Sequence, residues 1–161
     1  MTEADILATG PFLMKGGVRG FEPVLEEILS GSVKEIQLLS YIFTPQAFHI
    51  INLLQNAAER GVTIIIIVNS INSQNQVVRK KLLSLGKRYP HVQVLDFSRP
   101  DGGQLHAKVI VVDRKIAVVG SANLSWGGMY GNYEVGILLR GEGAWRLALL
   151  IDSIKQMIAE P

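Results

Sequence analysis

Apolar and polar residues follow one another along this chain in two periods, one typical of helices and one typical of strands. Spacings of three and four positions predict amphipathic helices, whereas continuous runs of β-branched and aliphatic residues predict buried strands. The expected helices are residues 19–30, a helix that starts at Pro45 and ends at Gly61, residues 74–86 and residues 142–158. The expected strands are residues 34–43, 62–68, 92–97, 105–112 and 116–120.

The order of these elements predicts the fold class. Strands alternate with helices along the first hundred residues, and such connections make neighbouring strands parallel. The last two expected strands are joined by the short segment Asp113-Arg-Lys-Ile116, so they run antiparallel. The sequence therefore predicts an α/β fold with a mixed, mostly parallel β-sheet, flanked by helices on both faces, in a single domain over residues 1–161. The apolar stripe of the last helix is expected to pack on this core. Its members are Leu147, Leu150, Ile151, Ile154 and Ile158.

Five polar residues and one glycine stand at fixed spacings, in the pattern H-x-K-x4-D-x6-G-S-x-N. Its members are His106, Lys108, Asp113, Gly120, Ser121 and Asn123. Because side chains repeat every second residue in a strand, His106 and Lys108 share one face. A two-residue or four-residue loop after Val112 would put Ser121 opposite Lys108 and Asn123 opposite His106, whereas a three-residue loop would break this register.

This set of side chains suits chemistry at a phosphodiester. Lys108 brings a positive charge to a non-bridging oxygen, and Ser121 and Asn123 donate hydrogen bonds where negative charge builds. His106 supplies a nitrogen that attacks phosphorus, since an imidazole is partly neutral near pH 7. Asp113 has the wrong parity to share the strand face, so we expect it at the end of the hairpin.

The pattern resembles the hallmark motif of the phospholipase D superfamily. The resemblance is specific over residues 104–139, and upstream it is a likeness of element order. It implies a metal-independent reaction through a phosphohistidine intermediate, without a cofactor, in which Glu134 orients the nucleophilic His106 and Asp113 supports the site. In-line displacement at phosphorus needs a nucleophile and an acid, and this chain carries one motif. We therefore expect a homodimer with its active site at the two-fold interface.

The small single-motif arrangement resembles the bacterial endonuclease branch of the superfamily. It predicts a phosphodiesterase that acts as an endonuclease on DNA or RNA. A phospholipid hydrolase or phosphatidyl transferase is the alternative enzyme, and it would need an apolar surface for acyl chains, which the sequence does not show. The other alternative is a non-catalytic nucleic-acid-binding module of a larger defence or repair complex, against which the intact motif argues.

Residues outside the motif are further candidates for substrate contact. Arg99 lies in the loop before the motif. Trp126, in a glycine-rich segment with Tyr130, is a candidate for stacking on a base, and the alternative is that these rings cap the core or a subunit interface. The basic residues at 79–81 and 87–88 either follow a nucleic-acid backbone or form the solvated face of a helix. The other two histidines, His49 and His91, are interpreted as structural or surface groups, because neither has a lysine two positions later.

Charge, cysteine content and the length of apolar runs narrow the possible classes of protein further. Sixteen basic and fourteen acidic residues give a net charge of +2, which permits a polyanionic substrate without requiring one. The absence of cysteine excludes disulfides and thiolate metal sites. The densest apolar run, residues 62–68, is far shorter than a membrane span, and the acidic start Met-Thr-Glu-Ala-Asp lacks the character of a signal peptide. We therefore expect a cytoplasmic protein that does not contact membranes.

Overall fold

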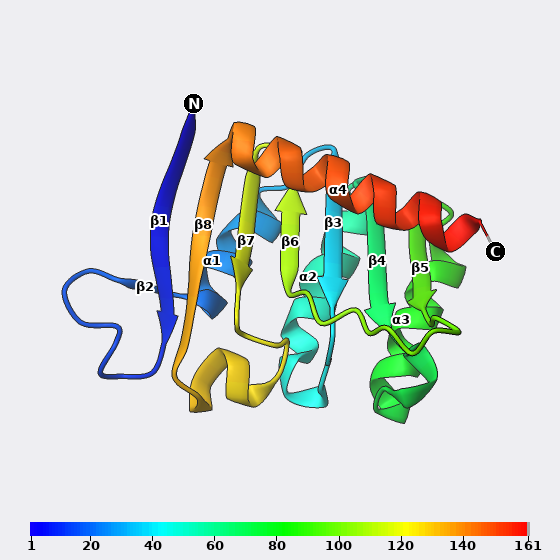
Figure 1. Ribbon diagram of the computed structural model, residues 1–161, viewed down its shortest axis with the longest axis horizontal. Coiled ribbons are helices and arrows are strands. Elements are labelled where there is room, and N and C mark those ends of the chain that lie inside the picture. The colour runs from blue at the N-terminus through cyan, green and yellow to red at the C-terminus, as the bar shows by residue number, and fades with distance from the viewer. Residues whose placement is uncertain (161) are drawn as a thin grey trace.

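The computed structural model describes residues 1–160 and is organised around one eight-stranded sheet with the order β2-β1-β8-β7-β6-β3-β4-β5 (Figure 1). The strands are β1 (Thr2–Thr9), β2 (Arg19–Gly20), β3 (Glu35–Ser40), β4 (Thr63–Asn69), β5 (Val92–Phe97), β6 (Val109–Val112), β7 (Ile116–Gly120) and β8 (Glu134–Gly141). The helices are α1 (Phe21–Ser30), α2 (Phe48–Glu59), α3 (Gln76–Arg88) and α4 (Glu142–Ala159). Short helical turns are η1 (Pro45–Ala47), η2 (Ile71–Ser73) and the π-helical η3 (Gly127–Gly131).

Helices cover both faces of the sheet. The long helix α4 crosses one face, and α1, α2 and α3 lie on the other (Figure 1). Each face has its own cluster of buried apolar side chains. The predicted α/β class, with a mixed sheet between two helical layers, is confirmed. Among residues 1–160, no helix is both long and apolar enough to cross a membrane.

Antiparallel pairing extends further through the sheet than the sequence predicted. β3, β4 and β5 are parallel to one another, and β1 is parallel to the short β2. The pairings β3–β6, β6–β7, β7–β8 and β8–β1 are antiparallel. The sheet is therefore mixed but not mostly parallel. The prediction failed because it left out β1 and β8: the exposed polar residues Glu3 and Asp5 interrupt the apolar pattern of β1.

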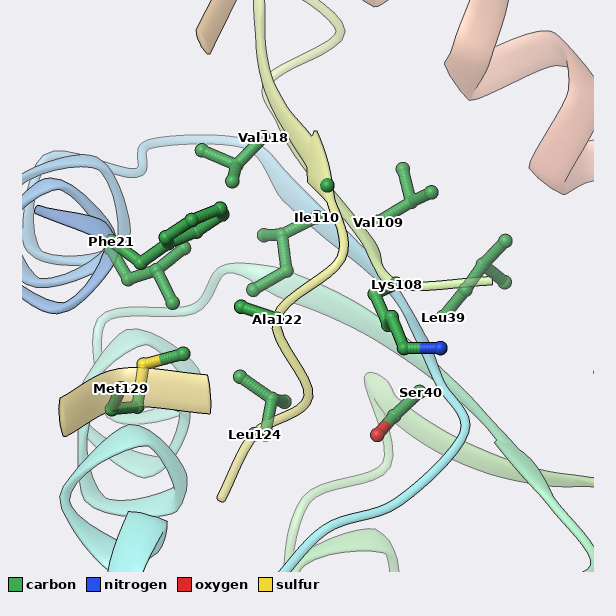
Figure 2. Close-up of a pocket in the computed structure, with 12 residues that line it drawn as sticks. Phe21, Leu39, Ser40, Lys108, Val109, Ile110, Val118, Ala122, Leu124 and Met129 are labelled. Carbon is green, nitrogen blue, oxygen red and sulfur yellow. The ribbon is translucent and has the colours of Figure 1, made fainter. Parts of the chain in front are cut away.

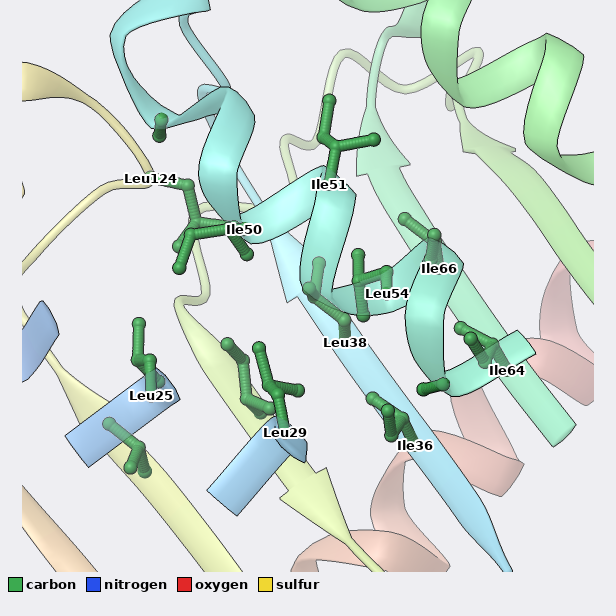
Figure 3. Packing of buried hydrophobic residues seen from close by; sticks show 14 of the residues in the cluster. Leu25, Leu29, Ile36, Leu38, Ile50, Ile51, Leu54, Ile64, Ile66 and Leu124 are labelled. Carbon is green, nitrogen blue, oxygen red and sulfur yellow. The ribbon is translucent and has the colours of Figure 1, made fainter. Parts of the chain in front are cut away.

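The main core fills the space between the sheet and helices α1 and α2 (Figure 3). Alternate residues of β3 and β4 point into it, and those between them point towards α4. Because both faces are covered, these strands read as continuous apolar runs in the sequence. Burial of each such side chain contributes roughly 1.5–3 kcal/mol to folding. The fully buried members at this contact include Leu25, Leu29, Ile36, Leu38, Ile50, Leu54, Ile64 and Ile66.

Helix α4 packs closely on the sheet because small side chains of the helix face the sheet. Ala144, Ala148 and Ile151 are buried at this contact, and Leu147, Ile154 and Ile158 pack against it in part. Leu150 does not belong to the stripe as predicted: its side chain is 56% exposed. The two alanines define the contacting side of the helix, and this rotates Leu150 towards solvent.

The ends of the other helices differ from the predictions by a few residues. Helix α3 starts at Gln76 because Asn75 caps it, with its Oδ1 accepting hydrogen bonds from the backbone N–H of Val77 at 2.9 Å and of Val78 at 3.3 Å. The helix expected from Pro45 divides into η1 and then α2. These shifts leave the order of elements unchanged.

Candidate active site

The β6–β7 hairpin carries the motif in a register one position away from the predicted one. Val109 pairs with Val119 and Val112 pairs with Ile116, so the loop has three residues. Its residues Asp113 and Arg114 have φ values of +54° and +56°, in the left-handed region that few non-glycine residues adopt. The predicted two-residue loop is therefore wrong. So is the pairing of Ser121 with Lys108 and of Asn123 with His106.

The four side chains nevertheless surround one open pocket. The segment before β6 and the segment after β7 both continue beyond the paired strands, and they line a cavity of about 480 Å³. Its lining includes His106, Lys108, Ser121 and Asn123. Backbone contact between the two segments persists, since the N–H of Gly120 donates to the carbonyl of Lys108 at 3.4 Å. Extended backbone beyond the hairpin, and not strict strand pairing, brings the motif together.

Two residues that line this pocket, His106 and Lys108, contact each other and the ring of Tyr41. The Lys108 Nζ lies 3.2 Å from the His106 Nδ1 and donates to the His106 carbonyl at 2.7 Å. The ring of Tyr41 lies against both, with its centroid 4.3 Å from the imidazole centroid and 5.1 Å from the Lys108 Nζ. Sequence reasoning missed Tyr41. Its position just after the carboxyl end of a parallel strand, where ligands commonly bind in α/β sheets, was the available signal.

Apolar surroundings affect the charge of Lys108. Figure 2 shows its stem beside a small cavity of about 20 Å³, with the amine pointing away from the apolar side chains. Burial lowers the pKa of Lys108 below the ordinary value of 10.5, and the negative charge of Glu134 partly opposes this shift. The apolar lining of the cavity includes Phe21, Ile110, Val118, Ala122, Leu124 and Met129.

Glu134 contacts Ser121 and makes no hydrogen bond to His106 within residues 1–160. The Ser121 Oγ donates to the Glu134 carboxylate and accepts from the backbone N–H of Val135 at 3.2 Å. The Asn132 Nδ2 donates to the other carboxylate oxygen at 3.1 Å. Glu134 therefore fixes the hydroxyl of Ser121 in this chain, whereas the resemblance implied that it orients the histidine.

Asn123 presents a buried acceptor to the site. Its Oδ1 has no hydrogen-bond partner within the described chain, an arrangement that costs roughly 1–3 kcal/mol and that often marks a functional position. The turn η3 lies directly on its backbone: a Cβ at Gly128 would come within 2.0 Å of the Asn123 carbonyl. The Thr9 Oγ1 donates to the Gly128 carbonyl at 2.7 Å and anchors the turn to β1.

Asp113 lies at the opposite end of β6 from the pocket. Six residues of extended chain lie between it and His106, so seven steps of about 3.3 Å separate the two by roughly 23 Å. Its carboxylate accepts hydrogen bonds from the backbone N–H of Val33 at 3.0 Å, of Lys34 at 2.7 Å and of Glu35 at 2.9 Å. It therefore joins the start of β3 to the hairpin, and it acts on the site only by fixing the position of β6.

We expect Asp113→Ala to lower the free energy of unfolding by about 2–4 kcal/mol, because three backbone donors lose a charged acceptor. Equilibrium unfolding in urea measures the change. Asp101→Ala is the matched control, since the Asp101 carboxylate accepts one hydrogen bond, from Gly103, in an exposed loop. Equal losses of stability in the two variants would show that Asp113 does not hold the hairpin to β3.

Arg99 and Trp126 do not line the pocket of His106. The carbonyl of Arg99 accepts from the N–H of Gly102 at 3.1 Å in a tight turn. The ring of Trp126 lies against Gly131, where a Cβ would come within 1.9 Å of it, and the side chain is 58% exposed. Trp126 is thus held at the surface three residues after Asn123 and does not cap the core.

The remaining candidates take part in local packing. The Lys81 Nζ lies 4.8 Å from the Phe48 ring centroid, between α2 and α3, and none of the basic residues of α3 lines the pocket. His49 lies 3.4 Å from the Glu22 carboxylate, and the His91 Nε2 lies 2.8 Å from the Ala58 carbonyl. Among residues 1–160, no group of three His, Cys, Asp or Glu side chains has the arrangement of a metal site.

Comparison with known proteins relates this geometry to a family. The family described as "Cardiolipin synthase, PLD-like domain" matches residues 25–157. DISARM protein DrmC of Bacillus paralicheniformis is 29% identical over 140 residues, which cover 86% of this chain and 57% of that protein. Cardiolipin synthase A of Buchnera aphidicola is 25% identical over 141 residues, covering 84% of this chain and 26% of the enzyme. The chain thus spans between a quarter and about three fifths of these relatives.

Two solved structures share the whole fold. NucT from Helicobacter pylori superposes with a TM-score of 0.73 at 23% identity, covering 99% of this chain and 97% of that one. Nuc from Salmonella typhimurium, a phospholipase D family member, superposes with a TM-score of 0.72 at 17% identity, covering 95% and 93%. The family match covers most of the chain and includes every residue that lines the pocket of His106. The chain therefore belongs to the phospholipase D-like family.

Proposed function

We propose that this chain is a metal-independent phosphodiesterase that cuts DNA or RNA through a phosphohistidine formed on His106. The observation that carries the proposal is the single open pocket in which His106, Lys108, Ser121 and Asn123 meet. A nucleophile, a cation and polar side chains in one cavity are the parts that phosphoryl transfer needs. The likeness in fold to Nuc and NucT, which match this chain over nearly their full length, supports a nuclease.

The reaction would run in two displacements. A ring nitrogen of His106 attacks phosphorus, a P–N bond forms, and the P–O bond to the leaving group breaks as that oxygen takes a proton from a second histidine. Water then attacks the phosphohistidine, gives its proton to the second histidine and releases the phosphate end. Lys108 and the Asn123 amide stabilise the non-bridging oxygens, while Glu134 holds the Ser121 hydroxyl in place.

The contact between Lys108 and His106 determines which nitrogen of the His106 ring carries the proton in the free enzyme. A lysine ammonium only donates, so the His106 Nδ1 accepts in this contact and a neutral imidazole carries its proton on Nε2. When Lys108 turns to a phosphate oxygen, Nδ1 no longer accepts from it; water can then protonate Nδ1 and take the proton from Nε2, which leaves the lone pair of Nε2 available for attack. Substrate binding would thereby activate the nucleophile.

Hydrolysis of a labelled oligonucleotide in excess EDTA tests the proposal. We expect single-stranded DNA or RNA to be cut at an unchanged rate in EDTA, because the proposed chemistry uses only His106 and its neighbours. Activity that EDTA removes and magnesium or manganese restores would contradict the mechanism. A protein that binds the oligonucleotide but never cuts it would instead be a non-catalytic module, as in a larger defence or repair complex.

A second copy of the chain would supply the second histidine, and an exposed apolar surface suits this partner. On the outer side of α4, Trp145 is 49% exposed and Leu149, one turn later, is 40% exposed. Beside this helix, Ile6 of β1 pairs with Ile137 of β8, and the two side chains are 56% and 39% exposed. Apolar side chains gathered on one face support a homodimer that covers them.

We expect Trp145→Asp to convert a dimer to a monomer, since the new charge would have to be buried at the interface. Light scattering after size-exclusion chromatography measures the mass, and nuclease assays should show the activity lost with the dimer. Leu83→Asp is the matched control, because Leu83 is 42% exposed on α3, on the opposite side of the sheet. A Trp145→Asp protein that stays dimeric would exclude this face as the interface.

Phosphatidyl transfer is the second candidate, and one surface feature favours it. In the loop between β1 and β2, Phe12 is 70% exposed and Met14 is 43% exposed, and the Lys15 Nζ lies 5.0 Å from the Phe12 ring centroid. Apolar tips beside a cation suit the surface of an anionic membrane. Incubation with phosphatidylglycerol vesicles, beside the oligonucleotides, distinguishes the two: release of glycerol or formation of cardiolipin would establish the lipid activity.

A further inference from the structure

A second cleft lies near His106, because Tyr41, whose ring packs against the His106 imidazole, is part of its lining. It has a volume of about 370 Å³ and opens at the carboxyl ends of the parallel strands β3 and β4, next to the segment that leads to His106. No residue in its lining carries a charge. The lining residues are Tyr41, Ile42, Phe43, Thr44, Asn69, Ser70, Ser73, Gln74, Asn75 and Gln104.

Hydrogen bonds fix the wall of this cleft and connect it to the site. The Gln74 amide donates to the carbonyls of Tyr41 at 2.9 Å and of Asn69 at 2.8 Å, and it accepts from the N–H of Phe43 at 3.1 Å. The Asn69 Oδ1 accepts from the N–H of Leu105 at 2.8 Å. The cleft and the residue before His106 are therefore held in one frame.

Other groups in the cleft are unpartnered or exposed. The Thr44 Oγ1 is buried and has no hydrogen-bond partner within residues 1–160. The side chain of Gln104 is exposed, two residues before His106. Ile42 is 39% exposed, and Tyr41 presents an aromatic ring to the same space. The cleft thus offers neutral hydrogen-bonding groups beside a flat ring and an aliphatic surface.

We propose that this cleft binds the nucleoside next to the phosphate that His106 attacks. Amide and hydroxyl groups match the donors and acceptors on the edges of a base, and an aromatic ring suits its face. A lining without charge favours a neutral base and sugar over a second phosphate or a choline headgroup. Ligand pockets hold about 300 Å³ or more, so a glycerol headgroup would leave most of this volume unused. The inference rests on the phosphodiesterase activity proposed above.

Three chromogenic diesters test the inference: methyl p-nitrophenyl phosphate and the p-nitrophenyl esters of thymidine 5′-phosphate and thymidine 3′-phosphate. We expect one of the two thymidine esters to be cleaved with a kcat/KM at least about tenfold above that of the methyl ester, a difference of about 1.4 kcal/mol. The preferred isomer identifies which side of the phosphate the cleft binds. The methyl ester reports the chemistry at His106 without a nucleoside.

Two variants test whether the cleft causes the preference for the thymidine ester over the methyl ester. Thr44→Val keeps the shape of the side chain and removes the hydroxyl, and Gln104→Ala removes the amide. Each should reduce the preference for the thymidine ester at least about threefold and leave cleavage of the methyl ester unchanged. The matched controls are Thr63→Val and Gln93→Ala, exposed positions at the amino-terminal ends of β4 and β5, and both should keep the wild-type preference. Thermal melting shows whether each variant folds.

The possible outcomes distinguish failure of the nucleoside site from failure of the phosphodiesterase activity. Cleavage of all three diesters with equal kcat/KM would overturn the nucleoside site and leave the phosphodiesterase intact. A further substrate, p-nitrophenyl phosphocholine, carries a lipid headgroup in place of the nucleoside. If Gln104→Ala lowers kcat/KM for this substrate as much as it lowers kcat/KM for the thymidine ester, the cleft binds a lipid headgroup, and the inference is overturned. If no diester is cleaved, the proposed function fails and the nucleoside site fails with it.

Discussion

His106→Asn is expected to abolish nuclease turnover, with a fall of roughly four orders of magnitude or more, because the attacking nitrogen is removed. The Asn side chain keeps much of the volume, and the exposed position of His106 makes the fold insensitive to the change. The variant should therefore bind oligonucleotide like the wild type. Rapid quenching of the wild-type reaction should trap an acid-labile, alkali-stable phosphate on the protein, and the variant should show none.

His91→Asn is the matched control for this experiment. The same substitution is made just before β5, away from the pocket, where the His91 ring contacts the Ala58 carbonyl. This variant should keep the wild-type turnover. A His106→Asn protein that still cuts at a comparable rate would exclude His106 as the nucleophile.

Lys108→Met should lower the chemical rate by roughly two to three orders of magnitude, the scale observed when a group that stabilises transition-state charge is removed. The pH dependence should reveal the same residue. Burial lowers the pKa of Lys108, so its ammonium loses the proton at a lower pH than an ordinary lysine with a pKa of 10.5. Activity that needs the charged form is present below that pKa and falls as the pH rises through it.

The variant Lys108→Arg provides the control for the pH profile. A guanidinium keeps its charge throughout the accessible range, so the alkaline fall in rate should move to higher pH even if the maximum rate is reduced. A profile with the same alkaline limb in wild type and Lys108→Arg would assign that limb to another group.

The motif could be located from the sequence, but its geometry could not. Residue identities and spacings were sufficient to place His106, Lys108, Ser121 and Asn123 in one site. The register depended on a loop in which Asp113 and Arg114 adopt left-handed conformations. Nothing in a dipeptide of these types predicts that, since the conformation is stabilised by three backbone N–H groups of a segment some 80 residues earlier.

Tyr41 shows a second reason why sequence reasoning was incomplete. It reaches His106 because β3 and β6 are neighbours in the sheet, a pairing that arises only when strands distant in sequence come together. Helices α1, α2 and α4 were predictable because a local periodic pattern defines them. By contrast, β1 and β8 carry exposed apolar and exposed polar residues, and they pair with each other across more than 120 residues of sequence.

The pairing of β1 with β8 has a consequence for how the chain folds. Residue 2 pairs with residue 141 and residue 9 with residue 134, so β1 finds its partner only after more than a hundred later residues have been synthesised. Contacts this distant in sequence slow folding, because closing the intervening chain is entropically unfavourable before they form. Loss of residues 132–161 would remove β8 and α4 and would also leave β1 without its main partner, so the stability of β1 depends on residues more than 120 positions later.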